Sequence, residues 1–204
     1  MSIEPHALME DINNFWFGDN DGETVPDRQV DMWFNNGRYY DQEIGARYEA
    51  LIDRVAAGAF DYWSVSAAGR LALLVALDQF PRHVYRGTAR SFAYDAKARE
   101  HCLSGIAANQ HLELSYLQQA IFYLPLEHAE DRALQERSVA LYAHLATQVR
   151  DENKATYLSY HHYASLHRDI VVRFGQFPHR NELLGRASSA TETAFLLEPN
   201  SSFL

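Results

Sequence analysis

Two helical runs in this chain end in almost the same five residues, QFPRH at 79–83 and QFPHR at 176–180. Each copy places a proline directly before an arginine and a histidine. A residue that precedes proline is pushed out of the α-helical region, so each copy predicts a helix end followed by polar side chains. A glycine then predicts the close of the next turn, Gly87 in the first copy and Gly185 in the second.

Helical patterns also account for most of the remaining chain, whereas alternating β-branched runs are missing. Pro26 suits the first turn of a short helix that runs through Phe34, and Asp41 is suited to cap a helix that ends at Gly58. Further helices are predicted over 67–79, 91–107, 112–123, 130–149 and 154–174, and a capping box from Ser189 to Glu192 starts a last short one.

We therefore expect an all-α fold, a single domain over residues 1–204, with roughly eight to ten helices stacked in antiparallel pairs. The acidic loop 18–24 resembles a calcium loop, but the expected first ligand position is occupied by Phe17. We interpret this loop as a plain turn.

The amino-acid composition argues against several classes of function. The formal net charge of −9 argues against nucleic-acid binding and against anionic membrane surfaces, and no apolar run is long enough to cross a membrane. Met1 to Asp11 lacks the pattern of a signal peptide, and the single cysteine, Cys102, excludes an internal disulfide framework, so we expect a cytoplasmic protein.

The charge is uneven along the chain. Residues 78–99 carry five Lys or Arg against two Asp, and residues 157–186 carry four Arg against one Asp and one Glu. Both locally basic segments contain a proline elbow. If the elbows meet in space, they form a cationic spot on an acidic protein.

The candidate binding residues of the first elbow are Asp78, Arg82 and Arg86. A helical turn opened by Pro81 would place the two arginines four residues apart on one side, as a pair for a phosphate or carboxylate. The alternative is structural, with both arginines capping the carbonyls of the preceding helix and pairing with Asp78.

The second elbow follows a helix whose apolar stripe includes His167, so a buried, hydrogen-bonded histidine and a ligand-binding one are both open interpretations. Asp169 and Arg173 are spaced for a weak surface ion pair. The polar candidates of this segment are His167, Arg173, His179, Arg180, Asn181 and Arg186.

A third proline elbow begins at Pro125 and is acidic, with Glu127, His128, Glu130 and Asp131 close together. It would pair with Arg82, Arg173 or Arg180 if it faces the basic elbows. The alternative is that these carboxylates lie at a helix N-terminus, where the helix dipole favours them.

Neither a metal nor a cofactor is predicted. The ten histidines include no HExxH spacing and no Cys/His pairing, and no phosphate loop, dinucleotide-binding glycine pattern or GxSxG motif is present. Cys102 lies between apolar residues of a helix and is predicted to be core.

Three segments resemble the bacterial domain of unknown function 924 family: LDQFPR…YRG at 77–87, LPLEH.E at 124–130 and RFGQFPHRN..LGR at 173–186. Trp33, Phe34 and the helix after Asp41 also fit, so the resemblance covers nearly the whole chain. It implies an all-α fold similar to tetratricopeptide-repeat proteins and no assigned activity.

Three functional hypotheses follow. The leading one is a binding or scaffold protein whose elbows hold an anionic group, such as a peptide carboxylate or a small phosphorylated ligand. The second is a hydrolase or transferase with Glu127 or Asp78 as base and His128, His167 or His179 as acid. In the third, the elbows form an internal ion-pair network and the protein self-associates, as a homo-oligomer, through exposed aromatics such as Trp16, Phe17, Trp33 or Phe34.

Overall fold

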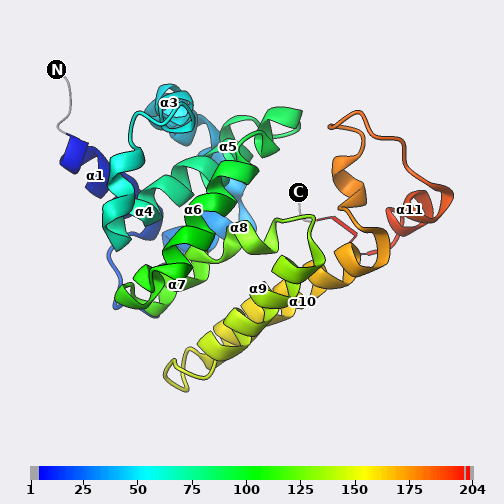
Figure 1. The fold of residues 1–204 in the computed structure, drawn as a ribbon. Helices are drawn as coiled ribbons and strands as arrows, with labels where there is room; N and C mark the ends of the chain where they lie inside the picture. Colours follow the sequence, from blue (N-terminus) through cyan, green and yellow to red (C-terminus); the bar gives the residue numbers. More distant parts are fainter. Residues whose placement is uncertain (1–4, 200, 203–204) are drawn as a thin grey trace.

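The computed structural model describes residues 5–199 and 201–202, and within them every regular element is helical (Figure 1). This confirms the all-α prediction for the described part of the chain. The helices are α1 (Pro5–Phe17), α2 (Asp27–Val30), α3 (Gly37–Ala56), α4 (Ala67–Leu74), α5 (Phe80–Val84), α6 (Asp95–Ala107), α7 (Tyr116–Phe122), α8 (Leu124–Glu127), α9 (Arg132–Leu145), α10 (Lys154–Phe174) and α11 (Ala190–Phe195).

Helices α1 to α8 pack into a bundle around α4, whose side chains are buried at nearly every position from Ala67 to Leu74. The Ser66 side chain caps the start of α4, because its hydroxyl oxygen accepts a hydrogen bond from the backbone N–H of Gly69. Helix α3 turns one apolar stripe toward the core, and all five of its members are buried: Ile44, Tyr48, Leu51, Ile52 and Val55.

Pro81 does not stop the first apolar run. The chain passes from α4 through a π-helical turn, Val75–Gln79, directly into α5, with Pro81 in the first turn of α5. Proline lacks an N–H and its ring crowds the carbonyl four residues earlier, and the widened turn accommodates both effects. The prediction of a helix end at Gln79 is therefore wrong, and α5 carries Arg82 and His83 onward on a helical backbone.

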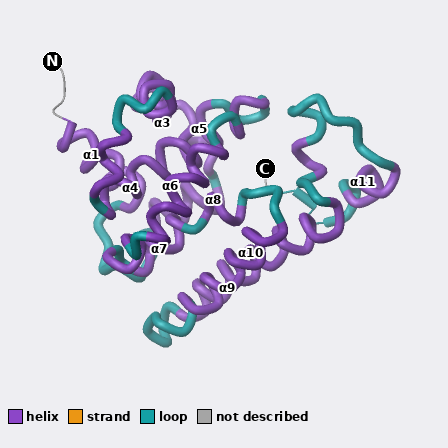
Figure 2. Tube along the Cα trace, viewed as in Figure 1, coloured by secondary structure: helices purple, strands orange, loops and turns teal. Residues whose placement is uncertain are grey.

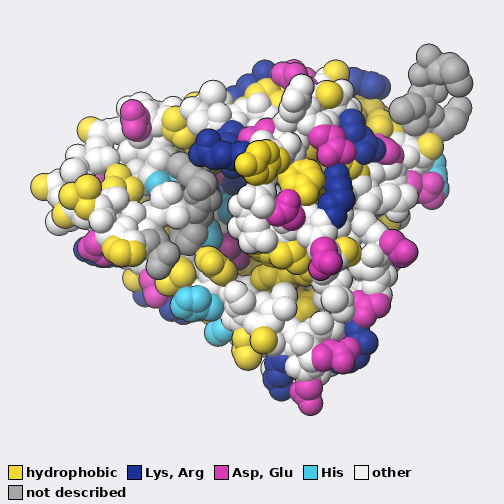
Figure 3. Space-filling view, turned by 180° about the vertical axis from the view of Figure 1, so that it is seen from behind, with side chains coloured by type: hydrophobic (Ala, Val, Ile, Leu, Met, Phe, Trp, Pro, Cys, Tyr) yellow, Lys and Arg dark blue, Asp and Glu magenta, His cyan; other side chains and the backbone are white. Residues whose placement is uncertain are grey.

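Helices α9 and α10 form a long antiparallel pair that extends away from the bundle (Figure 2). Its far end carries charged side chains of both signs (Figure 3), where Arg150 pairs with Asp21 and Glu23 of the loop after α1. Gly175 ends α10 in the left-handed conformation, at φ +74°.

The chain then turns through Pro178–Arg180 and reaches α11, whose predicted capping box between Ser189 and Glu192 is present. A small apolar cluster of Ile170, Val171, Phe177 and Phe195 fastens this segment to α10.

Two local predictions need correction. Asp41 does not cap α3, which begins at Gly37; its carboxylate instead faces α5. Trp16 and Phe17 are buried, so they offer no exposed surface for self-association. The stacking of a tetratricopeptide-repeat protein stays a prediction. Among the described residues, no helix is long and apolar enough to cross a membrane.

We expect two helical glycines to respond to alanine in opposite ways. A Cβ at Gly69 would overlap the backbone carbonyl of Trp63, which cannot retreat, whereas a Cβ at Gly45 meets nothing within 4 Å. Gly69→Ala should lower the free energy of unfolding by about 2 kcal/mol or more. Gly45→Ala should raise it by about 0.5–1 kcal/mol. Urea denaturation measures both, and equal effects would contradict the packing described for α4.

Candidate functional site

Two of the three proline elbows, the first and the third, meet at one buried carboxylate, that of Asp78, whose side chain is 1% exposed. Oδ1 of Asp78 lies 3.3 Å from Nη1 of Arg82 and accepts a hydrogen bond of 2.9 Å from Nδ1 of His128. The Gln79 amide donates to the other carboxylate oxygen. One carboxylate therefore joins the first elbow to the acidic third one.

Asp95, in the first turn of α6, joins the first elbow to the second. Arg82 donates to both of its carboxylate oxygens, each at 3.0 Å, in a bidentate pair. Nη1 of Arg180, from the second elbow, lies 3.4 Å from Oδ2 of the same carboxylate. The two arginines thus approach a single acid from different parts of the chain.

A second carboxylate, Asp41 on α3, orients the outer end of α5. It accepts two hydrogen bonds from Arg86, at 2.7 and 2.9 Å, and one of 2.8 Å from Nδ1 of His83. These contacts fix the Arg86 guanidinium beside that of Arg82.

Glu127 and His167 form a buried pair on the third and second elbows. Oε1 of Glu127 lies 3.2 Å from Nδ1 of His167, and that Nδ1–H donates to the carbonyl of Tyr163 at 2.9 Å. Burial, and then the charge of Asp78, raises the pKa of Glu127 to about 8. Burial lowers the pKa of His167 to about 3, so at neutral pH both members are uncharged.

Glu130 is a structural partner of the second elbow. Its carboxylate takes two hydrogen bonds from Arg186, at 2.6 and 2.8 Å, and one of 2.8 Å from the backbone N–H of Phe177. Oδ1 of Asn181 accepts a hydrogen bond of 2.9 Å from Nε of Arg186, and Nδ2 of Asn181 donates one to the carboxylate of Glu192. These bonds hold the segment that carries His179 and Arg180 against the third elbow.

Arg180 is the least satisfied charge in this cluster. Its side chain is 8% exposed, and its Nε has no hydrogen-bond partner among the described residues. The guanidinium stacks between the rings of Phe92 and Phe177, 4.7 and 4.5 Å from their centroids. Within the described part of the chain, its one carboxylate contact is to Asp95, which Arg82 already holds. Burial and the charge of Arg82 lower the pKa of Arg180 to about 10.

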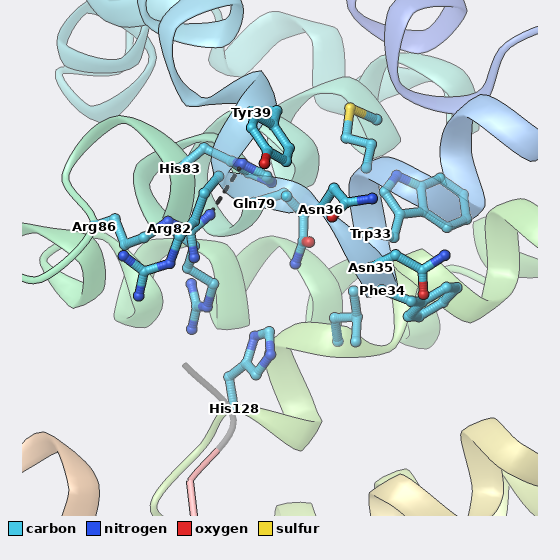
Figure 4. A pocket seen from close by; sticks show the side chains of 14 residues that line it. Trp33, Phe34, Asn35, Asn36, Tyr39, Gln79, Arg82, His83, Arg86 and His128 are labelled. Atoms are coloured by element: carbon cyan, nitrogen blue, oxygen red, sulfur yellow. Dashed lines mark hydrogen bonds between the residues drawn. The ribbon is translucent and has the colours of Figure 1, made fainter.

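Two cavities adjoin the cluster. The smaller, about 90 Å³, is lined by three arginines and three histidines: Arg82, Arg86, Arg180, His128, His167 and His179. The larger, about 650 Å³, has Arg82, Arg86 and His83 on one side, His128 at one end and an aromatic and amide wall opposite (Figure 4). Arg82, Arg86 and His128 line both cavities, so these three side chains stand where the two meet.

The histidines around the small cavity are neutral. Burial, and then the charge of Arg180, lowers the pKa of His179 to about 4, and burial together with Arg82 lowers that of His128. Burial alone would raise the pKa of Asp78, but Arg82 and His128 outweigh it and hold that pKa well below its usual range. Nδ1–H of His128 therefore donates to an ionised carboxylate, which leaves the neutral ring its basic character at Nε2.

Most predicted site residues are brought together: Asp78, Arg82, Arg86, Glu127, His128, His167, His179 and Arg180 form the cluster, and Asn181 and Arg186 support it. Arg173 lies elsewhere. It stacks on Phe174 and Phe195 beside a separate shallow cavity.

Several expected partners were wrong. Glu130 pairs with Arg186 rather than with Arg82, Arg173 or Arg180, and Glu127 pairs with His167. The predicted ion pair from Asp169 to Arg173 is replaced by one from Asp169 to Arg168. Sequence reasoning also missed Asp41 and Asp95 as members of the site. The available signal for Asp95 was that it is one of two acids in the basic segment 78–99, whereas Asp41 lies outside both basic segments.

In the described part of the chain, no group of three or more His, Cys, Asp or Glu side chains is arranged to hold a metal ion. Cys102 is buried as predicted and donates to the carbonyl of Phe122, and burial raises the pKa of its thiol. It lies among core residues rather than on either cavity.

Comparisons with known proteins identify relatives without an assigned activity. Residues 12–200 match the model of a family described as bacterial protein of unknown function (DUF924). A solved structure of the protein of unknown function ATU0120 from Agrobacterium tumefaciens superposes with a TM-score of 0.81 at 34% identity, covering 95% of this chain and 99% of that one. No curated protein matches the chain.

Replacing Arg180 with methionine should stabilise the ligand-free protein. The folded state disfavours the Arg180 charge, through burial and repulsion from Arg82, and an uncharged, flexible thioether packs well between two rings. We expect Arg180→Met to raise the melting temperature by a few degrees, measured by circular dichroism. A fall of similar size would show that the Arg180 charge itself supports the fold.

The Glu127 carboxyl should make stability fall as the pH rises from about 6.5 to 8. In this window Glu127 is protonated in the folded state and ionised in the unfolded chain, so raising the pH favours unfolding. The histidines with lowered pKa act in the opposite direction, but only below about 6.5. The slope should be at most about 1.4 kcal/mol per pH unit.

Chemical denaturation across this pH window tests the assignment. Glu127→Gln should remove the downward slope, while Glu182→Gln at an exposed position should keep it. A wild-type slope that persists in Glu127→Gln would assign the titration to another group.

Proposed function

Because this chain belongs to the DUF924 family, whose function is unknown, we propose a function from the site itself: the protein binds a small anion, a phosphate or a carboxylate, in the cavity between its three elbows. A peptide carboxylate and a small phosphorylated ligand are both members of this class. The anion would lie against Arg82, Arg86 and Arg180.

The proposal rests on one observation, that the Arg180 guanidinium is buried and incompletely hydrogen-bonded. A buried guanidinium normally has a carboxylate of its own, because an unpaired buried charge costs several kcal/mol. Arg180 instead shares Asp95 at 3.4 Å and leaves Nε without a partner among the described residues, yet it forms part of a cavity wall. A bound anion supplies the missing acceptors.

The neighbouring charges fit the same function. Asp41 and Asp95 each hold an arginine fork by two hydrogen bonds, which fixes the position of both guanidinium groups before any ligand arrives. Fixed donors lose little conformational freedom on binding, and an anion gains from donors that are already oriented. The neutral histidines nearby add hydrogen-bonding groups without adding charge.

Acid–base chemistry is the second candidate, and the pairing of Glu127 with His167 favours it. The protonation states differ from the roles expected from sequence: Glu127, protonated at neutral pH, is suited to be the acid, and neutral His128 is better suited to be the base than His167, whose pKa of about 3 makes it a weak one. A hydrolase or transferase would hold its anionic substrate with the arginines and act through His167 or His128 at the cavity wall.

The third hypothesis, a purely internal ion-pair network, accounts for Asp78 and Glu130, whose partners all come from the protein. It leaves Arg180 unexplained. Self-association and a cytoplasmic location stay predictions.

Anion binding is tested by titrating the protein with inorganic phosphate and, separately, with acetate, using isothermal calorimetry. Arg180→Met and Arg86→Gln should each weaken phosphate binding about tenfold or more, because each removes charge-assisted hydrogen bonds. Arg173→Gln is the matched control, since it removes an arginine outside the site, and it should bind as the wild type does.

Circular dichroism establishes that each variant is folded before its affinity is compared. If folded Arg180→Met binds phosphate as tightly as the wild type, or if neither anion binds the wild type, the proposal fails. If Arg180→Met and Arg86→Gln both unfold the protein, the cluster is structural.

A further inference from the structure

The larger cavity has two chemically different ends. One end carries Arg82, Arg86 and His128, which it shares with the small cavity. The other is walled by two aromatic side chains and by amides (Figure 4), and its members are Trp33, Phe34, Asn35 and Asn36, whereas Tyr39 lies beside His83. Its volume of about 650 Å³ lies within the range of small-molecule sites.

The aromatic wall comes from an unusual stretch of backbone. Asp31–Asn35 forms a π-helical turn, and the opposite wall of the cavity includes Gln79, the last residue of the second π-helical turn. Such turns are rare and are frequent at functional sites. Here two of them, about forty residues apart in sequence, contribute to one cavity.

The π-helical turn presents its aromatic rings in different ways. One face of Trp33 stacks on the buried Trp16, with ring centroids 5.8 Å apart and planes at 27°. Phe34 is 56% exposed, although it is large and apolar, and it sits edge-on to Trp33 at 6.0 Å. A planar ligand in the cavity would cover the exposed ring of Phe34 and remove that apolar area from water.

The anionic end favours a phosphate over a carboxylate. Three guanidinium groups line the small cavity, two fixed by Asp41 and Asp95 and one buried between two rings. A tetrahedral phosphate presents three oxygens to such a set, whereas a carboxylate presents two. The small cavity, at about 90 Å³, has room for one such group and little else.

We propose that the ligand is a nucleoside 5′-phosphate, with its phosphate against Arg82, Arg86 and Arg180 and its base against Phe34 and Trp33. This proposal rests on the anion site proposed above and adds the aromatic half of the ligand. The amides of Asn35 and Gln79 carry both donors and acceptors, which suits the edge of a base. The sugar spans the middle of the larger cavity.

Three probes separate the two halves: AMP, inorganic phosphate and adenosine, each titrated by calorimetry. AMP should bind at least about tenfold more tightly than phosphate, since stacking on aromatic side chains contributes roughly that much per base. Phe34→Ala should remove this advantage and leave the phosphate affinity unchanged. Arg180→Met should weaken both AMP and phosphate.

Tyr163→Ala is the control for Phe34→Ala, because Tyr163 is 49% exposed on α10 and lines neither cavity. It should leave all three affinities unchanged. Since Phe34 is itself largely exposed, its removal should not unfold the protein, and the chemical shifts of the His128 ring on adding AMP give a readout that needs no variant.

The outcomes distinguish the two proposals. If phosphate binds and AMP binds no more tightly, the nucleotide inference is overturned while anion binding stands. The nucleotide inference is likewise overturned, and anion binding stands, if AMP binds tightly but Phe34→Ala leaves the AMP affinity unchanged. If neither phosphate nor AMP binds, both proposals fall.

Discussion

The buried carboxylate of Asp78 is the contact on which the rest of the site depends. It is the common partner of Arg82 and His128, and through them it ties α5 to the end of α8. An ionised carboxylate in the interior persists only when several donors meet it, and here a guanidinium, an imidazole and an amide do so. Its negative charge also reaches Glu127, whose proton it helps to retain. One acid thus sets the position of the arginine and the protonation of its neighbours.

The arginines around Asp78 differ in how completely they are paired with carboxylates. The guanidinium of Arg86 pairs with Asp41, that of Arg82 pairs with Asp95, and that of Arg186 pairs with Glu130. Arg180 remains buried and under-satisfied, at a cost to the folded protein. Proteins keep such costs where binding offsets them, so the same residue that weakens the empty fold is expected to strengthen the complex.

The sequence predicted the helical fold well because its signals were local. Apolar stripes, the Ser66 and Ser189 caps and the left-handed Gly175 depend on residues a few positions apart. The site was predicted in its membership but less well in its pairings. Asp41 and Asp95 were missed because a carboxylate at a helix start has a local explanation, capping, which conceals a long-range one. The π-helical turns at Asp31–Asn35 and Val75–Gln79 had no recognisable signal, since their spacing depends on tertiary packing.

The two copies of the QFP motif have different backbone roles. In the first copy, Pro81 follows a widened turn and the helix continues to Val84, so Arg82 lies within α5 and Arg86 lies in the turn that follows it. In the second, Gly175 has already ended α10, and Pro178 opens a short 3₁₀ turn that carries Arg180. The copies nevertheless converge on the same carboxylate, because both arginines reach Asp95. The two copies thus share one acid, although the backbone that carries each arginine to it differs.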